Sequence, residues 1–221
     1  MLTQSLVRAS ETLAKWSVRG GGGLMFVGAM VVALDVVLRK LFSVTFGGAD
    51  ELAGYAMAIA TTWSFSYVLL KRGNVRVDAL YIHLPSKLGI TLDLVAVLGL
   101  GGFAALMARY GYEVFATSWE LASRSNSELK VPLWIPQGLW LLGLGQLVAT
   151  ATVLFVRAVT LLLQGKSDEF KRLLGAKTIE EEASAEASYI KEHEGEFLDA
   201  HVVVPTGAAA SGGKNSLNKG A

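Results

Sequence analysis

The chain contains no cysteine and only three histidines among its 221 residues. Without cysteine, the sequence excludes disulfides, thiolate catalysis and cysteine-ligated metal sites. The histidines are His83, His193 and His201, and none of them lies inside a long apolar stretch. A helix bundle that holds haem needs axial ligands within its spans, so the sequence also argues against a haem protein.

Motifs for catalysis and nucleotide binding are missing as well. The sequence has no Ser-His-Asp order, no HExxH, no P-loop and no GxGxxG segment that opens a helix. Residues 2–19 are too polar to contain the apolar core of a cleavable signal peptide. We therefore expect neither an enzyme nor a resident cofactor.

Charge is scarce, because 18% of the residues are charged and 52% are hydrophobic, and the mean hydropathy is +0.44. These values are typical of a small membrane protein with soluble ends. The apolar stretches predict an all-α integral membrane protein with four transmembrane helices. An amphipathic helix at the N-terminus is expected to lie in the membrane interface, and both termini are expected in the cytoplasm.

The most patterned stretch of the chain runs from residue 50 to residue 85. Asp50 and Glu51 open it, about twenty apolar residues follow, and Lys71, Arg72 and Arg76 close it. Twenty helical residues rise about 30 Å, the thickness of the hydrocarbon core. Carboxylates are favoured in a first helical turn. Capping explains Asp50, whereas for Glu51 a contact with a partner stays open.

Small residues recur at four-residue spacing within this second span. They form two lines, Gly54, Ala58 and Thr62 on one side and Ala56, Ala60 and Ser64 on the other. Such lines allow helices to approach closely. They predict helix packing and no ligand.

The N-terminal region carries two predicted segments. Residues 2–19 place an apolar stripe opposite a basic face, which indicates an interfacial amphipathic helix. Residues 20–23 are four glycines, interpreted as a flexible break, and a first span follows over residues 24–42. Asp35 and Arg39 share one face of that span. Either the two side chains extend to the membrane–water interface, or the pair docks onto a partner helix.

The third span is predicted over residues 88–112, continuing toward Trp119, and the fourth extends to about residue 163. A polar turn at residues 123–130 separates them. The fourth helix has roughly thirty residues, or about 45 Å, which exceeds the hydrocarbon core. The two helices are therefore expected to form a long hairpin that tilts or extends beyond the bilayer.

Basic residues are unevenly distributed between the two sides of such a four-span chain. The ends and the middle loop hold Arg8, Lys15, Arg19, Lys71, Arg72, Arg76, Lys87, Lys166, Lys171, Arg172 and Lys177, whereas the other two loops hold only Arg39, Lys40, Arg109, Arg124 and Lys130. The positive-inside rule then places both termini in the cytoplasm.

The chain divides into two parts at the end of the fourth span. Residues 1–165 are the predicted membrane domain, including the interfacial helix. Residues 166–221 are a predicted cytoplasmic charged tail, basic at first, acidic over 179–199 and low in complexity at its end, where disorder is expected. With so few polar groups inside its spans, the chain has the character of a scaffold or accessory subunit.

The order and spacing of several residues resemble a known family, the small membrane subunit (DctQ type) of the tripartite ATP-independent periplasmic (TRAP) transporters. The resemblance covers about residues 10–165. It is carried by Asp35 and Arg39, Glu51, Trp63, the segment from Arg72 to Asp78, and Leu84-Pro85, together with the surroundings of Ser118 to Glu120 and of Pro132 to Gly138. The long acidic tail departs from the shorter members of the family.

The resemblance implies a role in a transporter of the inner membrane. In this family the small subunit pairs with a large sodium-coupled permease subunit, and a periplasmic binding protein delivers an organic acid such as a dicarboxylate, a keto acid or sialic acid. The small subunit enlarges the stationary scaffold and contributes docking surface. It needs no cofactor, catalyses nothing and binds no nucleic acid; its other partner is the lipid bilayer.

Six residues are candidates for the subunit interface on that interpretation: Asp35, Arg39, Glu51, Arg72, Arg76 and Asp78. Two other functions are weighed beside it. One is a self-sufficient homodimeric exporter that binds protons at a membrane acid such as Asp35, although the neighbouring Arg39 lowers the pKa of such an acid. The other is a membrane anchor for a soluble enzyme, with the acidic tail as the contact.

Overall fold

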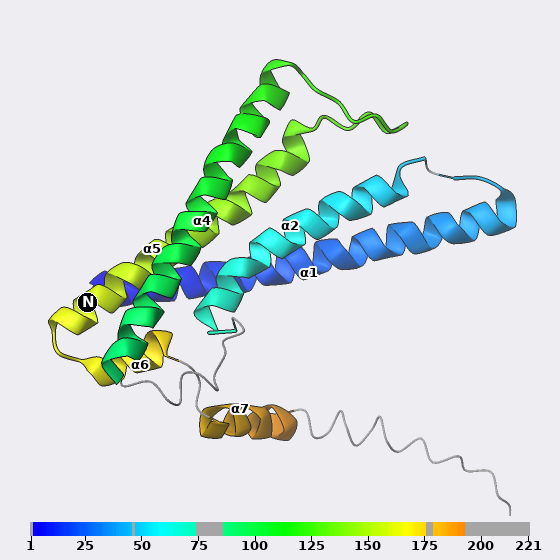
Figure 1. Cartoon of the computed structure of the whole chain (residues 1–221). Helices are drawn as coiled ribbons and strands as arrows, with labels where there is room; N and C mark the ends of the chain where they lie inside the picture. Colours follow the sequence, from blue (N-terminus) through cyan, green and yellow to red (C-terminus); the bar gives the residue numbers. More distant parts are fainter. Residues whose placement is uncertain (1, 46, 74–85, 176–178, 193–221) are drawn as a thin grey trace, which may run out of the picture. The chain divides into compact units, whose positions relative to one another are not determined.

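The computed structural model describes residues 2–45, 47–73, 86–175 and 179–192, in two units, Met1–Ala176 and Lys177–Ala221. The first unit contains helices α1 (Leu2–Phe42), α2 (Ala49–Leu70), α4 (Ser86–Glu120), α5 (Trp134–Leu163) and α6 (Ser167–Leu174) (Figure 1). The second contains α7 (Ile179–Glu192), within the predicted acidic segment. Among the described residues only one isolated bridge, between Arg124 and Pro132, is extended pairing. The predicted all-α class is confirmed.

Three of the described helices are long and apolar enough to cross a membrane, Gln4–Phe42, Leu88–Glu120 and Trp134–Leu163. They correspond to the predicted first, third and fourth spans. Helix α2 forms where the second span is predicted, but it is not among the three. Its role as a fourth span, and with it the placement of the termini, therefore stays a prediction.

Helix α1 runs without interruption through the four glycines, so the predicted flexible break at residues 20–23 is wrong. The reason is contact with α2. A β-carbon built on Gly21 would lie 3.1 Å from Ala60 Cα, and one on Gly28 would lie 3.0 Å from Ala56 Cβ. Packing against a neighbouring helix stabilises a segment that would not be helical on intrinsic propensity alone. Residues 2–19 are thus the first half of one 41-residue helix.

The face that α1 turns toward α2 repeats every seven residues. Between Gln4 and Phe42 the buried positions are Ala14, Gly21, Gly28 and Asp35. A seven-residue repeat keeps one seam in contact when two helices cross at a shallow angle. Because three of these four residues are alanine or glycine, the two backbones approach closely, as is common between membrane helices.

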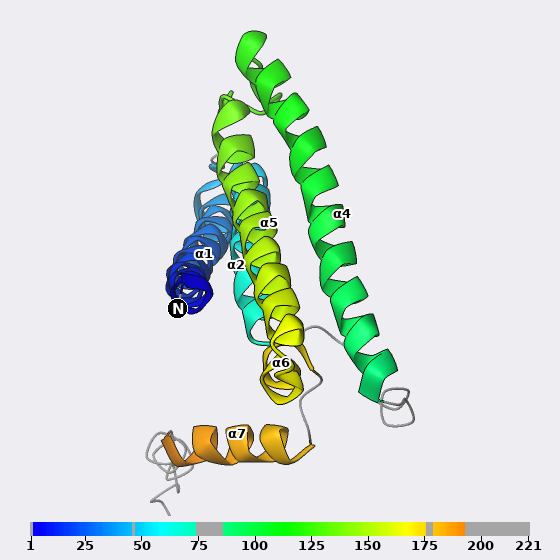
Figure 2. The same ribbon diagram turned by 90° about the vertical axis from the view of Figure 1, so that its left-hand side faces the viewer.

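Helix α2 packs against α1 on one face and against α5 on another (Figures 1 and 2). Trp63 Nε1 donates a hydrogen bond to Leu139 O of α5 at 2.9 Å. The buried Thr62 hydroxyl lies 3.1 Å from Ala58 O and 3.0 Å from Ile59 O within its own helix. A helix enclosed in this way can carry hydroxyl side chains at its buried positions, such as Thr62 and Ser66.

The second half of the core lies between α4, α5, α6 and the end of α2. Its buried members are Leu69, Val97, Ala104, Leu147, Ala151, Leu154, Ala158, Leu161, Phe170 and Leu174. Helices α4 and α5 form the predicted long hairpin, and Figure 2 shows α6 at its lower end, below α5. A large aromatic ring fits between the two long helices because Gly111 has no side chain, and Trp140 fills the space.

The α2–α5 crossing generates a stability prediction at Gly143. A β-carbon on Gly143 would lie 2.6 Å from Thr62 Oγ1 and 2.8 Å from Trp63 Cδ1. Overpacking of this kind costs about 1–3 kcal/mol, so Gly143→Ala is expected to lower the unfolding midpoint of the purified protein in detergent. Gly145→Ala is the matched control, because nothing lies within 4 Å of its β-carbon. The control gains helix propensity only; equal midpoints for the two variants would contradict the close crossing.

Candidate functional site

The predicted interface residues fall at opposite ends of the first unit. Asp35 and Arg39 lie near the end of α1, and Glu51 lies in the first turn of α2, so the connection between the two helices brings all three to one end. Arg72 lies just after α2, at the other end. Arg76 and Asp78 lie outside the described residues.

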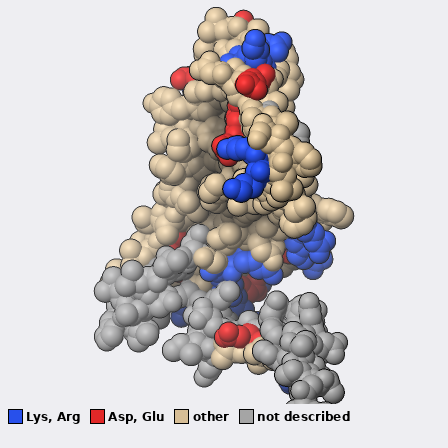
Figure 3. Space-filling model, turned by 90° about the vertical axis from the view of Figure 1, so that its right-hand side faces the viewer, with Lys and Arg blue, Asp and Glu red and all other residues tan. Residues whose placement is uncertain are grey.

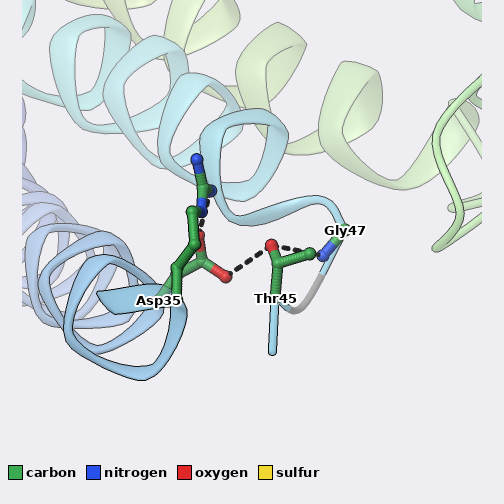
Figure 4. A network of polar contacts seen from close by, with 4 residues as sticks. Asp35, Thr45 and Gly47 are labelled. Carbon is green, nitrogen blue, oxygen red and sulfur yellow. Dashed lines mark hydrogen bonds and ion pairs between the residues drawn. The ribbon is translucent and has the colours of Figure 1, made fainter. Parts of the chain in front are cut away.

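Asp35 is buried and fastens the connection between α1 and α2 to the end of α1. Its side chain is only 2% exposed. Arg39 binds Asp35 Oδ2, while the Thr45 hydroxyl donates to Oδ1 at 2.9 Å and Gly47 N–H donates to that hydroxyl at 3.3 Å (Figure 4). The Asp35 carboxylate thus forms its contacts with neighbouring residues of its own chain. Arg39 remains 60% exposed and is the member of the pair that faces the surroundings.

Glu51 links α2 to the connection between α4 and α5. The Tyr55 hydroxyl donates to Glu51 Oε1, and the hydroxyls of Ser127 and Ser125 lie close to the carboxylate. The two serine hydroxyls are 3.0 Å apart, and Val131 N–H donates to Ser125 Oγ at 3.2 Å. This set of hydroxyls holds residues 125–131 over the start of α2.

Two glycines before α2 allow this close approach. Glu128 lies directly against Gly47, and Leu129 lies directly against Gly48, where any side chain would collide with them. Gly47 also has a φ of +64°, in the left-handed region that favours glycine. The two interhelical connections therefore form one cap over this end of the bundle.

At the opposite end α6 folds back onto the bundle. Phe170 is fully buried and Leu174 is 2% exposed, both in the core with α5. Arg72 Nη1 donates to Gly175 O, just after α6, at 3.3 Å. Arg72 thereby joins the end of α2 to the end of α6.

An ion network supports α6 in this position. Lys166 Nζ donates to Glu169 Oε1 at 2.9 Å, and Arg157 Nη2 of α5 lies 3.6 Å from Glu169 Oε2. The hydrogen bond from Lys166 holds the pKa of the Glu169 carboxyl below its ordinary value. Arg157 is 13% exposed, and Asp93 of α4 is 3% exposed.

Sequence reasoning missed the anchoring role of Phe170 and the contribution of Arg157. A signal for the first was present, since Phe170 and Leu174 are spaced four apart directly after a span and share one helix face. A basic start of the tail was predicted from the sequence, and the structure shows there the short helix α6, with two acids and two bases. What could not be seen is that its apolar face meets the bundle.

The described residues form no group of three or more histidine or acidic side chains that could hold a metal ion. One open hollow measures about 330 Å³ and is lined by one face of α4, at Tyr112, Phe115, Ala116, Trp119 and Glu120. Aromatic side chains gather there: Phe115 and Trp119 have ring centroids 6.3 Å apart, and Trp119 meets Trp134 edge-on at 4.9 Å. A belt of this composition is typical of a membrane–water boundary.

The outer faces of α1 and α4 are apolar and exposed. Their large exposed side chains include Met25, Phe26, Met30, Leu34 and Val37 on α1 and Leu92, Val95, Leu98, Phe103 and Leu106 on α4. Such faces are stable only when lipid or another protein covers them. The described bundle thus has hydrogen bonds and ion pairs that join its helix ends, and its outer faces are apolar.

The model of the DctQ component of the tripartite ATP-independent periplasmic transporters matches residues 28–161. The chain belongs to this family. The DctQ match begins in the second half of α1 and ends within α5, so it includes the cap and the part of the α1 seam from Gly28 to Asp35. No curated protein and no solved structure matches the chain.

Membership confirms the resemblance seen in the sequence and identifies a small membrane subunit of a TRAP transporter. The family is a transporter component and not an enzyme family. The predicted interface residues Asp35, Arg39, Glu51 and Arg72 all lie inside or beside helices that the match covers, but their contacts in the structure are within the chain.

A double-mutant cycle tests the Asp35–Arg39 pair. Arg39→Ala leaves a buried carboxylate with less charge compensation, and because the guanidinium is largely exposed we expect a loss of about 1–3 kcal/mol in unfolding free energy. Adding Asp35→Asn removes the charge but keeps an acceptor for Thr45, so the double variant should be more stable than Arg39→Ala alone. Denaturant unfolding in detergent measures all four proteins; additive losses would contradict the pairing.

The burial of Phe170 predicts a large effect of truncation there. Phe170→Ala removes a fully buried ring and is expected to cost about 3–5 kcal/mol or to release α6. Phe103→Ala is the control, because that ring is 63% exposed on the outer face of α4. Limited proteolysis after α5 should become faster in the first variant only, and equal cleavage rates would show that α6 is not anchored by Phe170.

Proposed function

We propose that this chain is the scaffold partner of a large, ion-coupled permease subunit in sodium-driven uptake of an organic acid. A periplasmic binding protein delivers the acid, which belongs to a class such as dicarboxylates, keto acids or sialic acid. The observation that carries this proposal is the match to the DctQ component. It agrees with a bundle whose described residues contain no group of three or more side chains that could hold a metal ion.

The state of Asp35 favours the scaffold over a self-sufficient exporter. A proton-coupled exporter needs a membrane acid that is available to its cargo. The Asp35 carboxylate instead binds Arg39 and Thr45 in its own chain, and it is almost wholly buried. The anchor for a soluble enzyme gains no support from α7, which stands as a separate helix in the second unit.

The packing of α2 supports four spans with both termini in the cytoplasm of a bacterial cell. Helix α2 returns along α1 and packs against it, which supports α2 as the span that returns across a membrane that α1 crosses. With α4 and α5 as a second hairpin, the chain then begins and ends on one side, and the distribution of basic residues assigns that side.

The proposed subunit interface combines the apolar outer faces with the charged residues at the two ends. Arg39 is the exposed member of its pair and can meet a partner directly. Asp35 and Glu51 act by holding the cap in shape, and Arg72 does the same at the α6 end. Arg76 and Asp78 remain candidates from the sequence resemblance.

Co-purification tests the assignment. A tagged chain expressed in its native context and extracted gently is expected to bring with it a large protein with many membrane helices. Recovery of homo-oligomers only would overturn the proposal.

Loss of the cap is expected to weaken that assembly. Glu51→Ala removes the carboxylate that joins α2 to Ser125 and Ser127, so recovery of the large subunit should fall more than the substrate affinity of the complex that remains. Arg76→Ala is expected to act in the same direction. Glu113→Ala is the control, because Glu113 pairs with Arg109 at the exposed surface, where such a pair contributes roughly 0–1 kcal/mol. Normal recovery with a collapsed substrate affinity would contradict a scaffold role.

A further inference from the structure

Basic side chains from two separate elements meet at the α6 end of the bundle. We define the basic collar as Lys71 and Arg72, which follow α2, with Lys166, Lys171 and Arg172, which precede or belong to α6. The hydrogen bond from Arg72 Nη1 to Gly175 O brings these two elements together. Lysine and arginine side chains gather at the lower end of the described surface in Figure 3.

The way in which α6 docks turns its charges outward. Phe170 and Leu174 are buried in the core, so the rest of the short helix faces away from it, and both Lys171 and Arg172 are exposed. An amphipathic helix normally turns its apolar face to the membrane. Here the protein itself covers that face, which leaves the charges as the part of α6 available to a ligand.

Among the residues that the structure describes, acidic side chains at this end neutralise only part of the collar. Glu169 is engaged by Lys166 and by Arg157. Asp168 is the other acid in the first turn of α6, and Asp93 is buried inside the bundle. Lys71, Lys171 and Arg172 therefore outnumber the acid that remains at the described surface.

The opposite end of the bundle differs. There Arg39 is paired with Asp35 and Arg109 with Glu113, while Arg124 Nη1 donates to Lys130 O. The surface acids at that end include Asp50, Glu120 and Glu128. Only the α6 end presents a positive surface among the residues that the structure describes.

Exposed apolar side chains border the collar. Leu163, the last residue of α5, is 83% exposed, and Leu88, near the start of α4, is 53% exposed. A ligand that suits this boundary needs an anionic head beside the collar and an apolar body beside these leucines. Free phosphate satisfies the first requirement alone, whereas a phospholipid satisfies both.

We propose that the basic collar binds the phosphate of an anionic phospholipid, whose acyl chains cover the neighbouring apolar surface. Juxtamembrane clusters of lysine and arginine attract anionic headgroups through charge, which concentrates such lipids near them. The lipid would hold the ends of α2 and α6 together from outside, as Arg72 does from inside. This binding does not depend on whether the chain serves as a transporter scaffold.

Native mass spectrometry of the full chain, released from nanodiscs of mixed phosphatidylcholine and phosphatidylglycerol, tests the proposal. The wild-type protein is expected to retain phosphatidylglycerol in preference to phosphatidylcholine. The double variant Lys171→Gln/Arg172→Gln should retain roughly tenfold less, since each basic residue at the surface contributes to headgroup attraction. The variant Lys171→Arg/Arg172→Lys should retain the wild-type amount.

The control Lys40→Gln/Lys130→Gln removes the same charge from the opposite end and should leave lipid retention unchanged. Thermal unfolding in detergent checks that both double variants are folded. Equal retention by the collar variant and the wild type, or an equal loss in the control, would overturn the site. Inorganic phosphate at millimolar concentration is expected not to displace the lipid; full displacement would show a soluble-anion site and overturn the lipid assignment.

Discussion

Close contact between helix backbones is the constraint on which the rest of the structure depends. Small residues on α1 face small residues on α2, at Gly21 against Ala60 and Gly28 against Ala56. Gly143 of α5 then admits Thr62 and Trp63 of α2. Within a membrane the apolar faces of helices gain little by leaving lipid, so packing at short range and buried hydrogen bonds must supply the association. The Trp63 bond to Leu139 O is of that kind.

Because small residues form the seams, the charged side chains that join segments lie at the two ends of the bundle. Asp35 occupies the last position of the seven-residue repeat of α1, where the seam reaches the connection to α2. Its carboxylate accepts a hydrogen bond from the Thr45 hydroxyl in that connection. Glu51 performs the corresponding task for the other connection. At the far end Glu169 and Arg157 accompany the buried ring of Phe170. A charge is thus found where a connection or a short helix has to be fixed in place.

Much of this arrangement could be predicted from the sequence, because length and apolarity alone define the long helices. The α4–α5 hairpin and the Asp35–Arg39 pair followed from helix length and from four-residue spacing. The line through Ala56 and Ala60 correctly indicated a packing face, whereas Gly54 and Ala58 of the other line are exposed.

The predictions from the sequence failed where contact with another helix determines the structure of a segment. Four consecutive glycines have a poor helix propensity, and only the presence of α2 makes them helical. The buried hydroxyl groups of α2 reflect its enclosure by two helices, and its role as a span stays a prediction. The positions of Glu51 and Phe170 depend on connections that are distant in sequence, at residues 125–131 and at the end of α5, and no spacing rule relates them.

The two fastenings at opposite ends have a mechanical consequence. Two helical hairpins that are in contact only along a seam can rotate relative to each other about the point where their helices cross. Here the crossing at Gly143 lies between the cap at Glu51 and the docked α6, so a rotation that opens one end is resisted at the other. Separation of the two hairpins would therefore have to break contacts at both ends of the bundle.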